Sequence, residues 1–364
     1  MDLFSLAKPL LFAFSPETAH GLALHLLKAG LVPSSHETDD VALRVKLWGL
    51  DFPNPVGLAA GFDKNAEAAD AMLAQGFGFV ETGTVTPRPQ PGNEKPRIFR
   101  LSEDQAVINR LGFNNKGLNA YAARLARRRG LEKPGIVGAN IGANKDSEDP
   151  IQDYVTGLDR LLSYADYFTV NISSPNTPGL RKLQGREALD ELLGRLMATR
   201  EAAMNRLSVI PPLLVKIAPD LDEGERQDIA EIVLKHKMDG LIVSNTTVGL
   251  RDSLKSAHRD EGGGLSGQPL FEFSTGVLAD IYQLTGGKIP LIGVGGIGSG
   301  RQAYEKIRAG ASLVQLYSAL VYQGPGLVRK IKKELLECLY EDGYSEISQA
   351  VGAAHKQVQA AAKP

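Results

Sequence analysis

Cysteine is almost absent from this chain of 364 residues, which contains a single one, Cys338. One thiol excludes an intrachain disulfide framework and indicates a reducing compartment. Cys338 lies in a largely apolar stretch, residues 335–339. We therefore interpret it as a helix core residue rather than as a nucleophile.

Long apolar runs are also lacking, because none approaches the roughly 18 residues that a membrane-spanning helix needs. The first residues, from Met1 to Phe4, show neither the basic region of a signal peptide nor the arginine-rich character of an organellar presequence. We expect a protein that stays in the cytoplasm and can still touch a membrane surface.

The chain also lacks a large net charge of either sign. Lysine and arginine number 41 and aspartate and glutamate 42, for a net charge of -1. Nucleic-acid-binding domains carry a basic footprint, so we exclude that class of protein. The hydrophobic fraction of 43% is that of an ordinary globular protein with a large core.

Short runs rich in apolar and β-branched residues recur along the chain and are typical of buried strands. The runs are residues 56–60, 79–85, 136–142, 167–173, 213–218, 240–246, 291–297 and 313–319. Stretches with helical periodicity separate most of them, as at residues 66–75, 151–163 and 224–236. About eight such units predict a closed (β/α)8 barrel, a TIM barrel, with its active site at the carboxyl ends of the strands. Nearly every run ends in amides, hydroxyls, lysines or glycines, which fits that placement.

Residues 293–298, Gly-Val-Gly-Gly-Ile-Gly, match the dinucleotide-binding pattern G-x-G-x-x-G, but in the wrong context. They follow the seventh strand rather than the first, and Ser318 stands where an acid would hold a ribose. In a barrel, the loops after strands 7 and 8 commonly bind phosphate, helped by a helix N-terminus. We interpret this loop, with Tyr317 and Ser318, as the phosphate site of a mononucleotide such as FMN.

The amino-terminal region, residues 1–40, lies outside the predicted barrel of residues 41–340. Residues 2–14 are apolar nearly all round, and Ser15-Pro16-Glu17 then predicts the start of a second helix that runs to Gly30. Two short helices with excess apolar surface favour a hairpin in the membrane interface, and packing on the barrel is the alternative. The tail, residues 341–364, has no assigned function, and we expect residues 349–364 to be frayed or disordered.

Several blocks, in this order, closely resemble the dihydroorotate dehydrogenase family over roughly residues 45–330. They are residues 59–65 (Ala-Ala-Gly-Phe-Asp-Lys-Asn), 108–114 (Ile-Asn-Arg-Leu-Gly-Phe-Asn), 171–177 (Asn-Ile-Ser-Ser-Pro-Asn-Thr), 244–247 (Ser-Asn-Thr-Thr) and 264–267 (Gly-Leu-Ser-Gly), with the glycine loop. The resemblance implies oxidation of (S)-dihydroorotate to orotate in UMP biosynthesis, with FMN as hydride acceptor. Soluble members carry cysteine where this chain has Ser174, so the resemblance is to the quinone-linked, membrane-associated members.

The resemblance also implies residue roles, beginning with Ser174 as the catalytic base for the C5 proton, beside a water path flanked by Thr177 and Phe113. The implied flavin-binding residues are Ala60, Gly61, Lys64, Thr84, Asn140, Asn171, Lys216, Ser244, Gly267, Gly296, Tyr317 and Ser318. The implied substrate-binding residues are Lys64, Asn109, Arg110, Leu111, Gly112, Phe113, Asn171, Asn176, Asn245 and Thr246. His20 and Arg100 are placed along a quinone tunnel, and no metal is expected. The expected partners are dihydroorotate, orotate and a membrane quinone, for a monomer held peripherally on the cytoplasmic face of the cell (inner) membrane.

The chemistry of these side chains agrees in part with those roles. Asparagine offers both a donor and an acceptor, which suits the N–H and C=O edges of a pyrimidine ring. A serine base needs local assistance, and only His258, of six histidines, is placed to approach it. Lys216 would stabilise negative charge near flavin N1 and O2. Two alternatives stay open, a soluble relative that uses fumarate or a nicotinamide and a flavin-free phosphate-binding barrel; a non-enzymatic scaffold is a weaker third.

Overall fold

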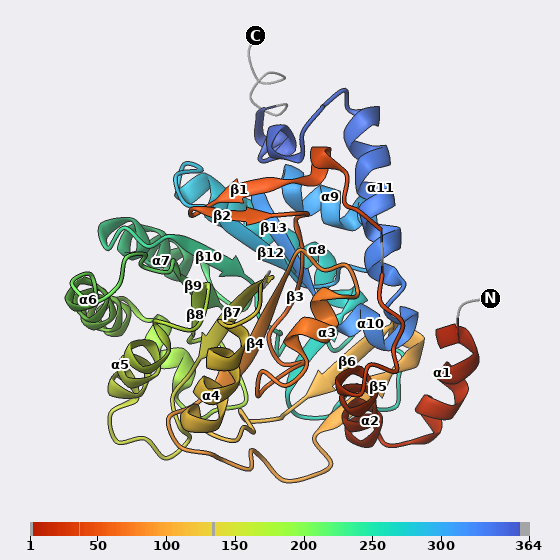
Figure 1. Cartoon of the computed structure of the whole chain (residues 1–364), viewed down its shortest axis with the longest axis horizontal. Coiled ribbons are helices and arrows are strands. Elements are labelled where there is room, and N and C mark those ends of the chain that lie inside the picture. The colour runs from red at the N-terminus through yellow and green to blue at the C-terminus, as the bar shows by residue number, and fades with distance from the viewer. Residues whose placement is uncertain (1–2, 36, 133–134, 357–364) are drawn as a thin grey trace.

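The computed structural model describes residues 3–35, 37–132 and 135–356, and eight parallel strands form a closed barrel at its centre (Figure 1). In chain order these strands are β3 (Val56–Leu58), β4 (Phe79–Val85), β7 (Ile136–Ile141), β8 (Tyr167–Asn171), β9 (Leu213–Ile217), β10 (Gly240–Val243), β12 (Leu291–Val294) and β13 (Ala311–Leu316). Each one overlaps a strand predicted from the sequence. The predicted (β/α)8 barrel is therefore confirmed.

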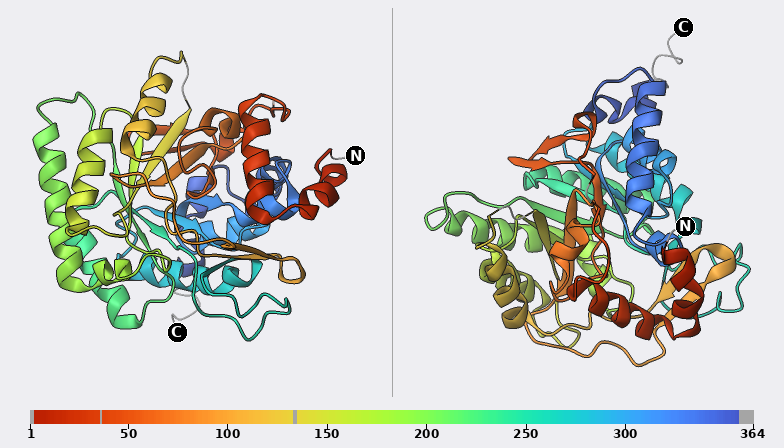
Figure 2. Two further views of the ribbon diagram at one scale, coloured as in Figure 1. Left: turned by 90° about the horizontal axis from the view of Figure 1, so that it is seen from below. Right: turned by 45° about the vertical axis from the view of Figure 1, so that its right-hand side comes forward.

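Helices surround the barrel on its outer side, as Figure 2 shows from two further directions. They are α3 (Ala69–Leu73), α4 (Leu118–Arg128), α5 (Pro150–Leu161), α6 (Arg186–Ala203), α7 (Glu223–Lys235), α8 (Phe271–Leu284), α9 (Gly300–Arg308) and α11 (Leu327–Glu341). The starts of α5 and α7 follow from local chemistry. The Asp149 side chain accepts the Gln152 N–H before α5, and Asp222 and Glu225 form a reciprocal capping box before α7.

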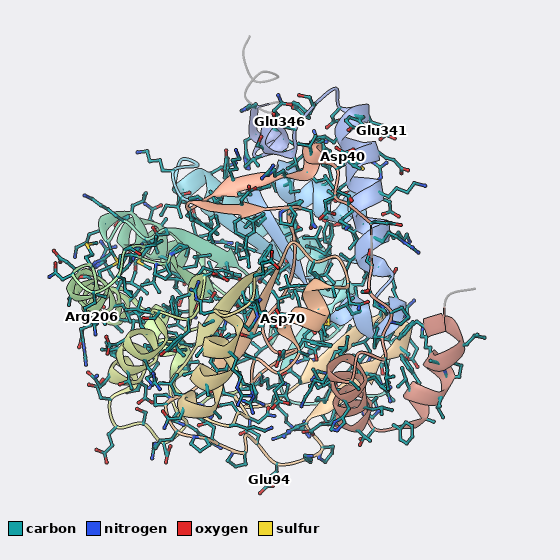
Figure 3. The ribbon with its side chains drawn as sticks, in the orientation of Figure 1. Asp40, Asp70, Glu94, Arg206, Glu341 and Glu346 are labelled. Carbon is teal, nitrogen blue, oxygen red and sulfur yellow. The ribbon has the colours of Figure 1, made fainter. Side chains whose placement is uncertain are left out.

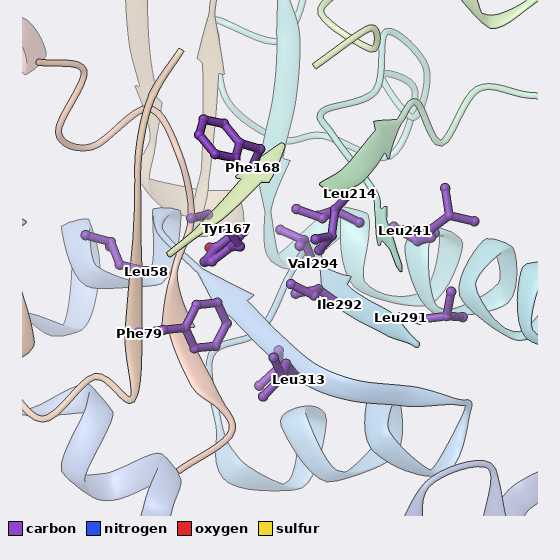
Figure 4. Close-up of a cluster of buried hydrophobic side chains, with 14 of the residues drawn as sticks. Leu58, Phe79, Tyr167, Phe168, Leu214, Leu241, Leu291, Ile292, Val294 and Leu313 are labelled. Carbon is purple, nitrogen blue, oxygen red and sulfur yellow. The ribbon is translucent and has the colours of Figure 1, made fainter. Parts of the chain in front are cut away.

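Large aromatic side chains fill the inside of the barrel (Figure 4). Phe79 and Tyr167 are fully buried there, with ring centroids 6.2 Å apart. Each ring occupies space that a glycine on the neighbouring strand leaves free: a Cβ at Gly57 would lie 2.3 Å from Phe79 Cζ, and one at Gly138 would lie 2.1 Å from Tyr167 Cζ. The barrel is thus a packed core rather than a pore.

The amino-terminal end of the barrel is closed by a short hairpin of β1 (Val45–Leu47) and β2 (Leu50–Phe52). At its turn, Trp48 Nε1 donates to the Asp239 carbonyl over 2.7 Å. The Trp48 ring contacts Phe52, which in turn contacts Phe79 inside the barrel. Because these apolar side chains close the amino-terminal end of the barrel, the site is expected at the carboxyl ends of the strands.

A three-stranded antiparallel sheet that the sequence analysis did not predict combines β5 (Ile98–Leu101), β6 (Ala106–Asn109) and β11 (Gly264–Gly267). Residues about 160 positions apart pair in it, such as Val107 with Ser266. The sheet has a small buried core of its own, made of Phe99, Leu101, Ala106, Ile108, Leu254 and Leu265. It brings two of the recognised sequence blocks side by side.

The amino-terminal helices are α1 (Leu3–Ala13) and α2 (Pro16–Lys28), and both were predicted. Ser15 caps α2 by accepting the Thr18 N–H, as expected. α2 packs near β5, while α1 lies at the edge of the molecule (Figures 1 and 2). Large apolar side chains of the two helices and of the turn between them remain exposed: Leu6, Leu10, Phe14, Leu22 and Leu26. Within residues 3–35, 37–132 and 135–356, no helix is both long and apolar enough to cross a membrane.

The carboxyl-terminal segment is better ordered than we predicted. Ala350 and Ala353 are buried, the Gly352 N–H donates to the Ile307 carbonyl, and a ring nitrogen of His355 lies 2.9 Å from the Ala309 carbonyl oxygen. The expectation of a frayed or disordered tail is therefore wrong for residues 349–356, because small alanine side chains allow close packing on the barrel. Its remainder, residues 357–364, lies outside the described residues. Cys338 is buried in the core, as predicted.

Charged side chains of both signs are spread over the outer surface (Figure 3). Arg206 and Glu341, for example, lie on distant parts of the molecule, and each is more than half exposed.

Candidate active site

A cavity of about 380 Å³ lies at the carboxyl ends of the barrel strands. The carboxyl ends of the strands bound the inner part of this cavity, and the β5–β6–β11 sheet forms one side of it. Helices α1 and α2 bound its outer part, which is the part farthest from the barrel. Most residues expected in the flavin, substrate and quinone sites line it together: His20, Ala60, Gly61, Lys64, Thr84, Arg100, Asn109, Leu111, Gly112, Phe113, Asn171, Ser174, Asn176, Lys216, Ser244, Asn245, Thr246, Gly267, Gly296, Tyr317 and Ser318.

Two of the expected binding residues, Arg110 and Asn140, are not among the cavity's lining residues. The Arg110 guanidinium donates to Glu261 over 2.7 Å and stacks on the Phe99 ring, so it faces away from the cavity. Asn140 is fully buried beneath Thr84, whose hydroxyl donates to Asn140 Oδ1 over 2.5 Å. The ligand-binding roles of both residues stay predictions.

Ser174 follows β8, is 5% exposed and lines the cavity. Oγ accepts the Asn176 N–H over 3.2 Å. His258 lies elsewhere, exposed and against the Phe99 ring, so the histidine considered from the sequence does not reach the serine. Thr177 is buried beside Ser174, and Phe113 lines the cavity.

The loop that carries Ser174 is tied down by Arg181. Its guanidinium donates to the Ser173 carbonyl over 3.0 Å, to the Thr246 carbonyl over 3.1 Å and to Asp220 Oδ2 over 2.9 Å. These contacts join the loops after β8, β9 and β10. Arginine suits this role because its planar fork offers several donors in fixed directions.

Four asparagines from three segments of the chain form two close pairs at the cavity. Asn245 Nδ2 lies 3.4 Å from Asn171 Oδ1, and Asn176 Nδ2 lies 3.4 Å from Asn109 Oδ1. The predicted grouping of these amides is found. Their donors and acceptors line the same cavity, so they can be matched to a planar ligand with both kinds of group.

Two lysines bring positive charge into the inner part of the cavity. Lys216 is 5% exposed, and no other group in the described part of the chain hydrogen-bonds its ammonium. Burial lowers the pKa of Lys216, while the nearby Glu81 carboxylate opposes that shift. Burial also lowers the pKa of Lys64 to about 8, and its Nζ donates to the Gly61 carbonyl over 2.7 Å. An anionic ligand would stabilise both charged forms.

The glycine loop after β12 is shaped as a cradle. A Cβ at Gly296 would lie 2.5 Å from Phe271 Cα, so a side chain has no room there. At the start of the following helix, α9, Glu334 Oε2 accepts the Gly300 N–H over 2.6 Å, and the contribution of this helix to phosphate binding stays a prediction. The short α10 (Ser318–Gln323) after β13 also begins at the cavity, as the extra helix of many barrels does.

The outer part of the cavity is mostly apolar. His20 on α2 packs edge-on against Phe62 and lies near Tyr317. Burial and the Lys64 charge lower the pKa of His20 to about 3, so its ring is neutral at physiological pH. The Arg100 guanidinium hydrogen-bonds the carboxyl-terminal end of α1 and the turn after it. It donates to the carbonyls of Leu11, Phe12 and Phe14.

The family model described as "Dihydroorotate dehydrogenase" matches residues 42–339. The chain belongs to the dihydroorotate dehydrogenase family. It is 54% identical to a "Dihydroorotate dehydrogenase (quinone)" of Azorhizobium caulinodans, over 97% of this chain and 99% of that one. A mitochondrial relative of the same name from Oryza sativa subsp. japonica is 51% identical, over 96% of this chain and 80% of that one.

Solved structures of the family agree with the fold. The crystal structure of the Eimeria tenella dihydroorotate dehydrogenase in complex with ferulenol superposes with a TM-score of 0.89, at 44% identity, over 93% of this chain and 96% of that one. The ligand-free form gives 0.90. The family is flavin-dependent, and the recognition made from the sequence blocks is confirmed.

Sequence reasoning missed several residues that shape the site. Arg181 and Asp220 lie outside the recognised blocks, and only the fold brings them together. Phe62 and Ser173 stand inside those blocks, so the blocks themselves were a signal for them. Tyr322, which lines the outer cavity and donates to the Ala106 carbonyl, follows the predicted eighth strand and had no such signal.

Proposed function

We propose that this protein oxidises dihydroorotate to orotate in pyrimidine biosynthesis and passes the electrons through FMN to a quinone. The observation that carries the proposal is that one cavity has a polar inner part and an apolar outer part. Its inner part holds Ser174, Lys216 and the asparagines, and its outer part is an apolar passage under α1 and α2. A polar substrate and an apolar electron acceptor would thus reach one cofactor from different directions.

The inner cavity fits FMN by its donor set and its shape. The glycine cradle at Gly296 and the start of α10 suit one phosphate group. Lys216, buried without a hydrogen-bond partner among the described residues, suits the negative charge that a reduced flavin ring develops. Gly61, Thr84 and Ser244 would line the ring, with Ala60, Gly267 and Tyr317 around it. A bound FMN would supply the hydride acceptor for substrate oxidation.

Substrate binding would fall to the asparagine clamp and Lys64. The amides of Asn109, Asn171, Asn176 and Asn245 match a ring whose edges alternate N–H and C=O. Lys64, with its pKa lowered to about 8, remains largely charged at neutral pH and would pair with the substrate carboxylate. Thr246 and the backbone of residues 110–113 complete this set.

Ser174 would hold the proton taken from C5 of dihydroorotate. A hydroxyl is a weak base, so the proton must leave promptly, and water beside Thr177 and Phe113 would carry it away. Ser174 is nearly buried, Arg181 holds the neighbouring Ser173 carbonyl, and the Asn176 N–H donates to Ser174 Oγ, so these contacts would restrict the hydroxyl before substrate binds.

The quinone would enter through the outer passage, past His20, Tyr317 and Arg100. The exposed leucines of α1 and α2 would rest in the membrane interface, on the cytoplasmic face of the cell membrane. In this proposal residues 1–40 form the membrane and quinone module, residues 41–340 the FMN barrel and residues 341–364 a tail, and the protein acts as a monomer.

Anaerobic mixing of the purified protein with dihydroorotate tests the proposal. We expect the flavin absorbance band in the visible to bleach, and a soluble quinone to restore it where fumarate and NAD do not. A flavin that dihydroorotate cannot bleach would contradict the substrate. A purified protein without flavin would favour the phosphate-binding barrel instead.

A further inference from the structure

Glu81 is a carboxylate buried inside the barrel, where no sequence block drew attention to it. It lies on β4 and is fully buried. Its Oε1 accepts Asn140 Nδ2 over 2.7 Å. Its Oε2 accepts three further donors: Tyr167 Oη, Thr169 Oγ1 and Gln315 Nε2. Burying a carboxylate is costly, and four donors with Lys216 nearby offset that cost.

A continuous path of hydrogen bonds leads from Glu81 toward the cavity. Asn140 donates to Glu81 with its nitrogen and accepts the Thr84 hydroxyl with its oxygen. Thr84 Oγ1 then accepts Asn171 Nδ2 over 2.9 Å. This path places the Asn171 amide nitrogen toward the barrel interior and its oxygen toward Ser173.

The same path continues into the substrate clamp. The Ser173 hydroxyl donates to Asn171 Oδ1 over 2.9 Å, which leaves Ser173 Oγ as an acceptor for Asn245 Nδ2 over 3.0 Å. Asn245 Oδ1 in turn accepts the Thr246 N–H over 2.8 Å. Two of the asparagines that line the cavity, Asn171 and Asn245, are therefore oriented through this path.

Glu81 sets the direction of the inner bonds of this path, from Asn140 to Asn171, while the backbone N–H groups of Ser173 and Thr246 support the same direction further out. An amide can exchange its nitrogen and oxygen by a half-turn, and a hydroxyl can rotate, so a path of such groups alone runs equally well in either direction. Both Glu81 oxygens accept in the hydrogen bonds described above, and Glu81 donates in none of them. Reversing Asn171 would require Asn140 to turn its oxygen toward Glu81, where two acceptors would repel each other.

We propose that Glu81 is a positioning residue that sets the donor and acceptor directions of the substrate clamp through Asn140, Thr84 and Asn171. The inference rests on the proposed function, since it concerns recognition of the same substrate. Glu81 does not itself line the cavity, and it acts through the residues between. Its effect is on ligand recognition rather than on the chemical step.

A double variant that exchanges the carboxylate at position 81 with the amide at position 140 tests this role without removing a hydrogen bond. In Glu81→Gln/Asn140→Asp, the glutamine amide at position 81 donates to the carboxylate at position 140, whose other oxygen still accepts the Thr84 hydroxyl. The direction beyond Thr84 is kept, although the charge has moved from one residue of the path to the next. In Asn140→Leu the path is cut, and Thr84 and Asn171 lose the inner partner that fixes their directions.

The dissociation constant for orotate on the oxidised flavoprotein is the measurement, read from the change in flavin absorbance. We expect Asn140→Leu to weaken orotate binding about 10-fold or more, because buried donors and acceptors lose their partners. The double variant should bind orotate within about 3-fold of the unmodified protein, because every donor in its path still meets an acceptor. Tyr167→Phe, which removes another donor to Glu81 and leaves the path intact, should bind orotate as the unmodified protein does.

Flavin content and the thermal midpoint of each variant separate folding from recognition. Orotate binding by Asn140→Leu equal to that of the unmodified protein would overturn the proposal. So would a folded, flavin-bound double variant as impaired as Asn140→Leu. If the leucine variant does not fold, Thr84→Val cuts the same path further out and carries the same expectation. Failure of the unmodified protein to bind orotate would instead count against the proposed function.

Discussion

The substrate clamp in the inner part of the cavity and His20 in its outer part differ in how their polar atoms are held. In the inner part, side chains such as Asn171, Thr84 and Asn245 hydrogen-bond one another in a path anchored at a buried carboxylate. In the outer part, the buried His20 Nε2 has no hydrogen-bond partner among the described residues, and Tyr317 Oη approaches its other ring nitrogen only to 3.5 Å.

This difference indicates that the inner part of the cavity discriminates more strongly between ligands than the outer part does. Polar groups that are already oriented discriminate strongly between ligands, because a wrong ligand leaves them unpaired. An apolar passage between two short helices selects mainly by size and hydrophobicity. We therefore expect inner changes to alter the reaction with dihydroorotate and outer changes to alter the reaction with quinone.

The largest effect is expected for Ser174→Ala in the inner part. Removing a general base costs about 10²–10⁴-fold in rate, so reduction of the flavin by dihydroorotate should slow by that range. Flavin content should not change, because Ser174 is not part of the phosphate cradle. Stopped-flow absorbance measures the rate, with chemically reduced flavin and quinone as the control for the outer reaction. An unchanged reduction rate would remove Ser174 from its proposed role.

A smaller inner effect is expected for Arg181→Ala. Loss of the contacts to the Ser173 and Thr246 carbonyls would loosen the loop that carries Ser174. Misplacement of a catalytic group by about 1 Å can cost on the order of 100-fold, and we expect a fall of about 10- to 100-fold in the same stopped-flow rate. Arg181→Lys should recover only part of it, because lysine lacks the planar fork. Equal rates in all three proteins would show that the loop holds its position without this contact.

In the outer part, Leu6→Glu/Leu10→Glu tests membrane contact. Both leucines are about two-thirds exposed, so charging them should not disturb the fold. We expect sedimentation with lipid vesicles to fall about 10-fold or more, since apolar burial in the interface is lost. The matched control is Leu131→Glu/Val209→Glu, which charges two exposed apolar residues outside the hairpin. Equal losses in both double variants would count against the hairpin as the contact surface.

The same contrast explains what could be predicted from the sequence. Strands and their polar ends follow from local patterns, so the barrel and the clustering of Ser174, Lys216 and Asn245 were predictable. The β5–β6–β11 sheet was not, because it pairs short segments about 160 residues apart whose own patterns are weak.

Directions of side chains were harder to predict than positions. Arg110 stands in a recognised block, yet its side chain turns outward to Glu261. Glu81 stands in a predicted strand, yet an alternation pattern does not say that a carboxylate will face the barrel interior. The capping of α9 by Glu334 depends on α11, a separate helix further along the chain. Such contacts are set by tertiary packing, and no local pattern encodes them.

The smallest effect concerns His20 and acid stability. Its pKa is lowered from 6.5 to about 3 in the folded chain, so the unfolded chain binds more protons between these values. Stability contributed by the neutral ring is therefore complete above pH 6.5 and is lost as the pH falls toward 3. His20→Gln cannot titrate, and we expect its thermal midpoint to fall less than that of the unmodified protein between about pH 7 and pH 5. His25→Gln, at an exposed histidine of the same helix, is the control. Parallel midpoints for His20→Gln and the unmodified protein would mean that solvent reaches His20, and that the outer passage is wetter than its apolar lining indicates.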